Sequence, residues 1–447
     1  MTAPLKRLCA AGVIVVLGIA AAPLRKIQFT DTRLSNGLRV IVSEDHAAPV
    51  FSIVVNYNVG SRDERKGRTG FAHLFEHMMF KGSENIGQNE HPYLIFMNGG
   101  VMNGTTSKDR TMYYETLPAN QLDLALFLEA DRMRSLTITR ENLDNQRNAV
   151  QEERRLAVDN QPYGKTFEAI DELAYENFAY EHSVIGSMAD LSAASVDDVA
   201  AFFKMYYAPN NAVVGIVGDI DTKTTLAKME KYFGAIPKQP AALQVDMSEP
   251  AQTEERRLTL EDALARLPRV DMAYKIPPSS SPDSDALSVL GTILSGGRSS
   301  RFYESIVRQK QLSSGVSAGS DGSRGPGLFE ISAVAMPGKT LAELEAAIDQ
   351  ETERVKTAPI EDWEIEKARI GARRSFVSGL GSSFNRAYLL SENAMFFDDP
   401  DRINTRADRI AKVTAADVQR VARQYLVKTN RSVVLTTPKA AGPKGAQ

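Results

Sequence analysis

Cysteine and histidine are scarce in this sequence, and neither sign of charge dominates it. The 447 residues include a single cysteine, Cys9, and only five histidines. The formal net charge is −3 and no basic run is long enough to form a patch, which argues against a nucleic-acid-binding protein. No stretch after residue 20 is long and apolar enough to cross a bilayer, so any membrane association would have to come from the N-terminal end.

The first residues have the pattern of an export signal. Lys6 and Arg7 precede an apolar run over residues 8–20, and small residues follow at 20–22. A run this short is typical of a signal-peptide core rather than of a membrane span. We therefore predict a signal peptide over residues 1–22 and a periplasmic protein, with an uncleaved membrane anchor as the alternative. Cys9 stands too early in the run for a lipid-modified cysteine, so the processed chain has no thiol to mispair in an oxidising compartment.

The rest of the chain has an ordinary globular composition and a weak internal repeat. It is 43% hydrophobic and 24% charged overall, which is compatible with a large core. Several residues recur 219 positions later: Asp198 and Asp417, Val199 and Val418, Tyr206 and Tyr425, Asn211 and Asn430, Val214 and Val433. In both copies a Ser or Thr opens a helix and a β-branched strand follows it. The repeat predicts two homologous domains.

A segment with three prolines and little periodicity separates the two copies. We predict an N-terminal domain over residues 23–237, a linker over 238–255, a C-terminal domain over 256–440 and a tail over 441–447.

Each half mixes strands and helices. Residues 38–42 and 51–55 are predicted strands, and Asn36-Gly37 is a strong hairpin signal before the first. Clustered strands followed by helices, without regular βαβ alternation, predict an α+β fold in which each domain packs an antiparallel sheet against helices on one face. Helices are predicted over residues 69–81, 121–135, 141–158 and 196–207.

The chemistry is concentrated in the first predicted helix, which contains His73-Leu74-Phe75-Glu76-His77. Thr69 is expected to cap this helix and Gly82 to end it. His73 and His77 are four residues apart, so they project from one face and can share one zinc ion. Glu76, beside them, is better suited to take a proton from a water molecule than to be the third ligand. An exposed polar stripe is the alternative, but two of the five histidines fall into this pattern within an apolar helix, which favours a metal site.

A catalytic zinc site commonly has three protein ligands, and the third must come from elsewhere. Glu152 and Glu153 are adjacent candidates on the predicted helix 141–158. At about 100° per residue, Glu153 lies on the flank of the apolar face, whereas Glu152 points roughly away from it. Glu153 is therefore the better candidate, and a solvated pair of glutamates is the alternative. Gln146 stands seven residues before Glu153 and is expected to hydrogen-bond the ligand carboxylate. The apolar face itself is inferred from Leu143, Val150 and Ala157.

These residues closely resemble the pitrilysin/insulinase family of zinc peptidases, whose signature is His-x-x-Glu-His. The resemblance covers about residues 28–437 and is closest to the bacterial branch that is similar to mitochondrial processing peptidase. The family's third ligand is a glutamate some 76 positions after the second histidine, and Glu153 stands 76 positions after His77. The resemblance implies one Zn²⁺ per chain held by His73, His77 and Glu153, with Glu76 as general base. It also implies two domains that form half of a clamshell chamber.

The resemblance extends to residues expected to hold the substrate. Residues 98–106 are similar to a family edge strand to which an extended peptide adds by backbone pairing, with Gly104 where alanine is usual. This implies substrate contacts at Gly99, Gly100 and Asn103, although a loop and a buried strand is the alternative. Glycines there would permit a close backbone approach.

Of three further positions, one matches the family pattern and two depart from it. Arg301 matches an arginine that contacts substrate in related chains, but Ser314 stands where a tyrosine is expected. Gln146 stands where many relatives carry glutamate. We predict that a homologous partner subunit supplies the complete arginine and tyrosine pair, so that the working enzyme is a heterodimer.

Together the residues predict a zinc-dependent endopeptidase acting on peptides or unfolded polypeptides. A non-catalytic assembly or binding subunit of the same fold is one alternative. A maturation peptidase with one dedicated peptide substrate is another, and it would use the same site.

Overall fold

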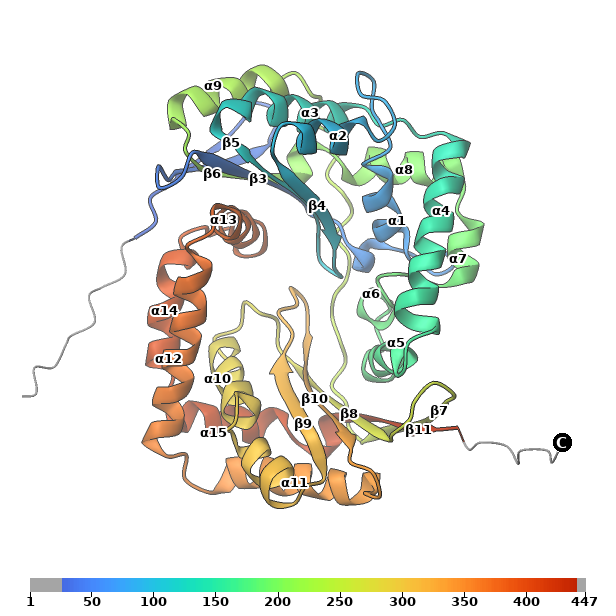
Figure 1. Ribbon diagram of the computed structural model, residues 1–447, viewed down its shortest axis with the longest axis vertical. Coiled ribbons are helices and arrows are strands. Elements are labelled where there is room, and N and C mark those ends of the chain that lie inside the picture. Colours follow the sequence, from blue (N-terminus) through green and yellow to red (C-terminus); the bar gives the residue numbers. More distant parts are fainter. Residues whose placement is uncertain (1–25, 440–447) are drawn as a thin grey trace, which may run out of the picture.

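The computed structural model describes residues 26–439, which build two β-sheets at opposite ends of the molecule (Figure 1). The predicted signal peptide, Cys9 and the predicted tail lie outside the described residues.

The N-terminal sheet contains β1 (Thr30–Arg33), β2 (Arg39–Glu44), β3 (Val50–Tyr57), β4 (Val101–Thr106), β5 (Thr111–Pro118) and β6 (Ala212–Gly218). Its order is β1-β2-β6-β3-β5-β4, which leaves β4 at one edge. β2 and β6 are parallel, and the other neighbours are antiparallel. The hairpin predicted from Asn36-Gly37 is confirmed, because β1 pairs with β2 and Gly37 adopts a φ of 93° in the turn.

The C-terminal sheet contains β7 (Arg256–Asp262), β8 (Arg269–Ile276), β9 (Ser313–Ser320), β10 (Gly327–Ala335) and β11 (Arg431–Pro438). Its order is β7-β11-β8-β10-β9, with β7 parallel to β11 and the other neighbours antiparallel. The order repeats that of the N-terminal sheet without an equivalent of β1.

Nine helices in the described part precede the second sheet: α1 (Phe71–Met78), α2 (Glu90–Met97), α3 (Leu122–Arg134), α4 (Arg140–Arg154), α5 (Gly164–Ala174), α6 (Phe178–Glu181), α7 (Met188–Ala193), α8 (Val196–Tyr206) and α9 (Thr222–Phe233). Six more follow within the described residues: α10 (Ser284–Ser295), α11 (Leu341–Thr357), α12 (Asp362–Gly379), α13 (Ser383–Phe397), α14 (Arg402–Lys412) and α15 (Ala415–Tyr425).

The sequence repeat corresponds to a structural repeat. Ser195 and Thr414 each cap a helix, α8 or α15, and an aspartate three residues on completes a capping box. After each helix an asparagine closes the turn: the Asn211 side chain donates to the Tyr206 carbonyl at 2.8 Å, and that of Asn430 donates to the Tyr425 carbonyl at 2.9 Å. An inner strand of each sheet, β6 or β11, then follows. The two homologous domains predicted from the repeat are therefore present, and the α+β fold is confirmed.

The prediction that each domain packs helices on one face of its sheet is confirmed, and the opposite face of each sheet is covered by the other half of the chain. One face of the N-terminal sheet packs on its own helices, but the other face packs on α13 of the C-terminal half, through Leu390 and Ala387 against Ile41 and Val54. Burying a side chain such as Leu390 contributes roughly 1.5–3 kcal/mol. Reciprocally, α5 of the N-terminal half packs on the C-terminal sheet. The near-continuous apolar sequence of strands such as β3 reflects this burial on both faces.

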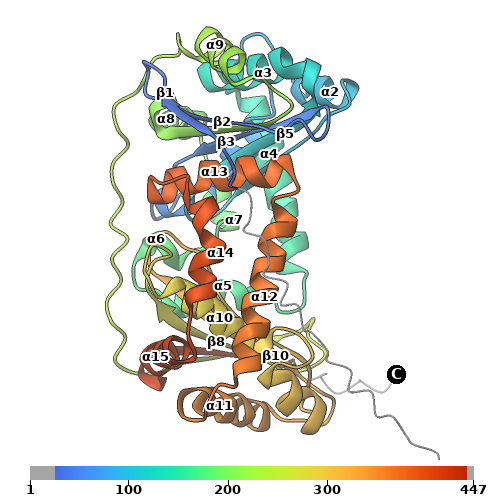
Figure 2. The ribbon, with the colours of Figure 1, turned by 90° about the vertical axis from the view of Figure 1, so that its left-hand side faces the viewer.

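The two domains are thus interlocked and form half of a clamshell-like chamber, with the two sheets and their helices arranged around the middle of the molecule (Figure 1). The segment between α9 and β7 contains no helix or strand. Figure 2 shows it running along one side of the molecule from one domain to the other. The exact domain boundaries proposed above remain a prediction.

Two predicted helices differ in extent from the observed ones. The first is limited to α1, which begins after Gly70 rather than at Thr69 and ends at Met78. The predicted helix 141–158 changes at Arg155 into a π-helical turn over Arg155–Asp159. This turn exposes Ala157, so Ala157 does not belong to the apolar face that Leu143 and Val150 form. The predicted helices 121–135 and 196–207 agree with α3 and α8 to within a residue.

Candidate metal centre

Helix α1 brings the two motif histidines onto one face. Its apolar residues are buried in the N-terminal core, among them Leu74, Phe75 and Met78, so the helix is held firmly on one side. On the other side the rings of His73 and His77 lie 4.8 Å apart, centroid to centroid, in an edge-to-face arrangement. Both side chains are only partly exposed, at 12% and 25%.

Glu153, near the end of α4, completes a cluster with the histidines. Its Oε2 atom lies 3.6 Å from His73 Nε2 and 3.4 Å from His77 Nε2. Glu152 instead pairs with Arg155 on the exposed side of the helix. The structure therefore brings Glu153 to the histidines and leaves Glu152 outside the cluster.

The spacing of these atoms fits zinc. Ligand atoms that sit about 2.0–2.1 Å from a tetrahedral zinc ion are roughly 3.3–3.4 Å from one another. The observed separations from the Glu153 oxygen, 3.4 and 3.6 Å, are close to this value without any rearrangement. All three ligand atoms lie within 4.8 Å of one another.

The protonation states of the cluster also suit a metal ion. Burial, together with the neighbouring His77 and against the effect of Glu153, lowers the pKa of His73 to about 4. A hydrogen bond from His77 holds the pKa of Glu153 below its usual range. The imidazole of His73 is therefore neutral near pH 7 and the carboxylate is ionised, as metal ligands must be. The Nδ1 atom of His73 is buried and has no hydrogen-bond partner in the described part of the chain.

Glu76 points from α1 toward the edge strand β4. Its carboxylate accepts a 2.6 Å hydrogen bond from Thr106 Oγ1, and only 8% of the residue is exposed. Burial raises the pKa of Glu76 above its usual range, although the Thr106 hydrogen bond opposes this. A Cβ atom on Gly104 would lie 3.0 Å from the Glu76 carboxylate, so the departure from alanine at this position gives Glu76 extra space. Glu76 is not one of the three clustered residues that could share a metal ion, but the charges of His77 and Glu153 both act on its pKa.

Thr69 does not cap α1, contrary to prediction. Its hydroxyl donates instead to Asp190 at 2.6 Å. Gly70 occupies the N-cap position with a φ of 82° and has no side chain to offer. Gly82 lies beyond the end of the helix, where it adopts a φ of 105°.

The cap is supplied by Glu64, which the sequence analysis did not single out. The Glu64 carboxylate accepts hydrogen bonds of 2.8 Å from the backbone N–H groups of Gly70 and Ala72. Its side chain is fully buried and its Oε2 atom lies 2.9 Å from His182 Nε2. Because His182 Nδ1 faces the Phe178 carbonyl at 2.7 Å, both ring nitrogens face acceptors, which favours an imidazolium paired with the carboxylate. The sequence signal that could have predicted this cap is an acidic residue, Glu64, a few positions before a helix whose N-cap is a glycine.

The residues expected to hold substrate lie at an exposed sheet edge. β4 is the edge strand predicted from the resemblance, and Gly99 and Asn103 are exposed along it. Gly99 adopts a φ of 77°, and a Cβ atom on Gly100 would lie 2.7 Å from Leu117. Both glycines are therefore explained by the tight turn from α2 into β4, whether or not they also touch substrate.

Arg301 and Gln146 make hydrogen bonds other than those expected. Arg301 is 7% exposed, and its Nε and Nη2 atoms each donate to Glu364 at 2.7 Å, so it forms a buried ion pair within the C-terminal domain instead of presenting its charge to a substrate. The Gln146 amide donates to Asn145 at 2.5 Å, and no hydrogen bond joins it to Glu153 in the described residues. Ser314 is exposed on β9, the edge strand of the C-terminal sheet.

A second group of potential ligands, His91, Glu115 and Glu129, is buried in the N-terminal domain. His91 Nε2 lies 2.5 Å from Glu115, and the Arg132 guanidinium binds Glu129. Burial lowers the pKa of His91 to about 3 and raises that of Glu115 to about 7. With an arginine already on one carboxylate, this group is a compensated set of core charges rather than an open metal site.

Comparisons with known proteins agree with the geometry. Residues 39–187 match the family model described as "Insulinase (Peptidase family M16)", and residues 193–371 match "Peptidase M16 inactive domain". The chain is 30% identical over 408 residues to "Zinc protease PqqE" of Helicobacter pylori, covering 91% of this chain and 92% of that protein. It is 23% identical to the "Probable mitochondrial-processing peptidase subunit beta" of Arabidopsis thaliana, covering 91% of this chain and 77% of that one. The crystal structure of a protease from Helicobacter pylori superposes with a TM-score of 0.89 at 29% identity, covering 92% of this chain and all of that one.

Proposed function

The chain belongs to the M16, or insulinase, family of peptidases, and on this premise we propose that it is a zinc-dependent endopeptidase acting on peptides or unfolded polypeptides. Relatives named zinc proteases support zinc as the metal. The observation that carries the proposal is the convergence of His73, His77 and Glu153 at zinc spacing, with a separate buried carboxylate, Glu76, beside them.

His73, His77 and Glu153 would hold one zinc ion per chain. Zinc bound there would polarise the scissile carbonyl and make the attacking water more acidic. Glu76 accepts the proton of that water at its carboxylate and later passes it to the leaving amine. Burial, which raises the pKa of Glu76, brings its basicity closer to the range in which such transfers are efficient.

The substrate would lie along β4. An extended peptide that pairs with this free edge is bound through its main chain, which accepts many sequences. Gly99 and Gly100 form the turn that enters β4, Asn103 is exposed on the strand, and we expect all three to contact the substrate there. Gly104 leaves Glu76 room beside this edge.

The decisive experiment replaces Glu76 with glutamine. We expect the variant to bind zinc as the parent does but to hydrolyse peptides about 10²–10⁴-fold more slowly, because only the proton transfer is removed. Glu152→Gln is the matched control, since Glu152 is exposed and pairs only with Arg155. A Glu76→Gln protein with full peptidase activity would overturn the assignment of the base.

A non-catalytic assembly or binding subunit is the second candidate, favoured by the description of the second matching domain as inactive. The two candidates differ in metal content. Protein purified without chelator should contain about one zinc per chain if it is the peptidase, and a protein that lacks zinc would favour the binding subunit.

We further propose that the working enzyme is a heterodimer with a homologous subunit. The Arg301 guanidinium forms an ion pair with Glu364, and Ser314 stands where related chains have tyrosine. The arginine and tyrosine expected to contact substrate in this domain are therefore not both available. The chain should gain peptidase activity when purified together with the product of a neighbouring homologous gene. Full activity of the chain alone would contradict this.

We also propose that the protein is exported to the periplasm, because of the basic start and apolar run in residues 6–20. No helix within residues 26–439 is long and apolar enough to cross a membrane. N-terminal sequencing of the protein from a periplasmic extract should give a chain that begins near residue 23.

A further inference from the structure

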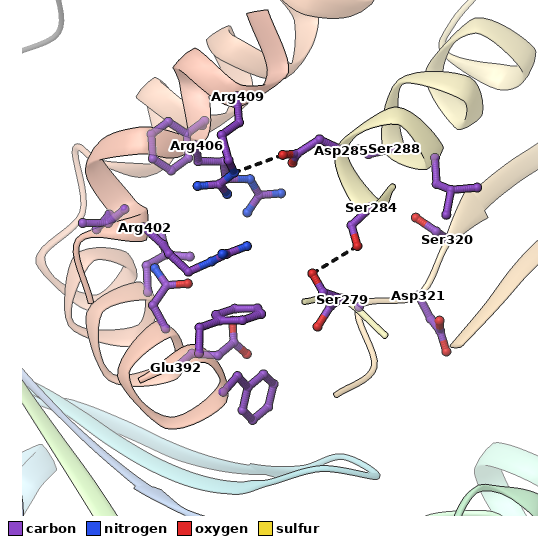
Figure 3. A pocket seen from close by; sticks show the side chains of 18 of the residues that line it. Ser279, Ser284, Asp285, Ser288, Ser320, Asp321, Glu392, Arg402, Arg406 and Arg409 are labelled. Carbon is purple, nitrogen blue, oxygen red and sulfur yellow. Dashed lines mark hydrogen bonds and ion pairs between the residues drawn. The ribbon is translucent and has the colours of Figure 1, made fainter. Parts of the chain in front are cut away.

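A cavity of about 330 Å³ lies in the C-terminal half, between α14, the first turns of α10, the end of α13 and the ends of β8 and β9 (Figure 3). Three arginines line it from α14: Arg402, Arg406 and Arg409. Their spacing of four and three residues places them on one face of that helix. Figure 3 shows that they point toward α10 across the cavity.

Only one of the three arginines is neutralised by an ion pair. Arg409 Nε lies 3.0 Å from Asp285 Oδ2, and its Nη1 atom donates to Thr405. The guanidinium groups of Arg402 and Arg406 make no hydrogen bond or salt bridge within residues 26–439. Arg402 lies over the ring of Phe397 at 3.9 Å. Burial and the nearby Arg409 lower the pKa of Arg402, which is the effect expected of cations crowded without enough anions.

Two further carboxylates line the cavity, but their own neighbours hold them. Glu392 accepts a hydrogen bond from Tyr388, and burial raises its pKa. Asp321 accepts hydrogen bonds of 2.8 Å from Ser323 and from the backbone of Leu328, and burial raises its pKa too. Neither carboxylate forms a hydrogen bond or ion pair with Arg402 or Arg406 within residues 26–439, although the charge of Arg406 acts to lower the pKa of Glu392. The guanidinium groups without an ion-pair partner in the cavity are therefore those of Arg402 and Arg406.

The opposite wall offers hydroxyl groups rather than charge. Ser284, Ser288 and Ser320 line this side of the cavity, and the Ser284 hydroxyl donates to the carbonyls of Pro278 and Ser279 (Figure 3). The planar guanidinium fork binds a carboxylate through two parallel hydrogen bonds, and hydroxyl groups can bind the same oxygens. The cavity also has enough volume for an acidic side chain and not only its carboxylate.

We propose that this cavity is a binding site for an acidic residue of the peptide substrate, held by Arg402 and Arg406. The inference rests on the proposed peptidase function and adds a substrate preference to it. α14 and α10 lie across the middle of the molecule from α1 and α4 (Figure 1). β4 lies between α1 on one side and α13 and α14 on the other (Figure 1), so a peptide paired with β4 can extend toward this cavity.

The test measures binding without cleavage. Short fluorescent peptides that differ only in carrying Glu or Gln at one position are titrated into zinc-loaded Glu76→Gln protein, and anisotropy gives the dissociation constants. At the best position we expect the Glu peptide to bind about tenfold more tightly, as charged hydrogen bonds allow. A pair with a free or an amidated C-terminus tells whether the carboxylate is a side chain or the chain end. Raising the salt concentration should reduce the difference.

Arg402→Gln combined with Arg406→Gln should abolish the preference for Glu while leaving the affinity for the Gln peptide unchanged. The doubly lysine-substituted protein should keep part of the preference, because it keeps the charge. Arg308→Gln is the control, since Arg308 is exposed in the same domain and pairs only with Glu304. If the double variant does not fold, Arg406→Gln alone decides, because Arg406 is exposed and should lose several-fold of the preference.

Equal binding of Glu and Gln peptides by the parent would overturn the proposal, as would a preference that survives the loss of both arginines or disappears in the control. Failure of the peptidase proposal would show differently, as the absence of zinc-dependent hydrolysis both by the parent chain alone and by the parent chain together with its homologous subunit. The titrations do not depend on turnover, so the two failures are distinguishable.

Discussion

The two domains share their strand order, their capping boxes and their closing asparagines, yet within the described residues only the first brings together the candidate metal ligands His73, His77 and Glu153. After β3 the chain enters α1 with its two histidines, whereas after β8 it enters α10, which contains no histidine. The second domain contains instead a buried ion pair between Arg301 and Glu364. The features retained in both copies stabilise the backbone, and the features found in one copy carry the chemistry.

The largest effect on activity is expected from replacing a candidate metal ligand, which only the N-terminal domain has in the described residues. Glu153→Gln should lower kcat/KM for a peptide by at least about 100-fold and reduce the zinc content, because one of three ligands is lost. Glu152→Gln, one residue away on the exposed side, should leave both unchanged. Metal analysis and peptide hydrolysis on the two variants would show whether the site depends on this one carboxylate, and equal losses in both would refute the assignment.

The second prediction concerns the buried pair of the C-terminal domain. Arg301→Gln leaves Glu364 buried without its charged partner, which should cost about 3–5 kcal/mol of stability. Thermal unfolding should move down by roughly 10 °C. Arg298→Gln, an exposed position three residues earlier, is the control. If Arg301→Gln raised the KM for peptide and left the stability unchanged, Arg301 would be a substrate contact, and the C-terminal domain would also carry part of the active site.

The third prediction tests what holds the metal helix. Glu64→Gln removes the charge that caps α1, so it should cost about 1–3 kcal/mol and speed the loss of zinc to a chelator. Asp283→Asn changes the N-cap residue of α10, the counterpart of α1, which makes no side-chain capping bond. It should leave zinc release unaffected. Equal zinc release from both variants would mean that Glu64 supports the fold in general and not the metal helix.

The smallest effect is a pH dependence. Burial lowers the pKa of His182, but the hydrogen bond to Glu64, the charge of Glu64 and hydrogen bonds to the backbone of Phe178 and Ser61 together outweigh it, so the pKa of His182 is raised. Its stabilising contribution is therefore full below the unfolded value of about 6.5 and is lost as the pH rises through the folded pKa. The difference in melting temperature between the parent and His182→Gln should shrink as the pH is raised from 6 toward the alkaline side. A difference that grows with pH would contradict the imidazolium pair.

Local patterns predicted the elements that depend on short-range spacing. The Asn36-Gly37 hairpin, the helices α3 and α8 and the 219-residue repeat follow from turn chemistry, periodicity and capping, which act within a few residues. The gathering of Glu153 with His73 and His77 agrees with an argument from one helix face and a family spacing. The extent of α1 was overestimated, because Thr69 finds a stronger partner in Asp190, which is distant in sequence.

The sequence by itself determined which residues could bind a metal and move a proton, since side-chain chemistry and helical spacing are local properties. Only the tertiary structure decided that α13 and α5 cover the far faces of the opposite sheets, that Glu64 caps the metal helix, and that Arg301 is held by Glu364. Each of these contacts joins residues brought together by the burial of apolar surface and the pairing of buried charge. Such pairings depend on the whole packed chain and leave no fixed spacing in the sequence.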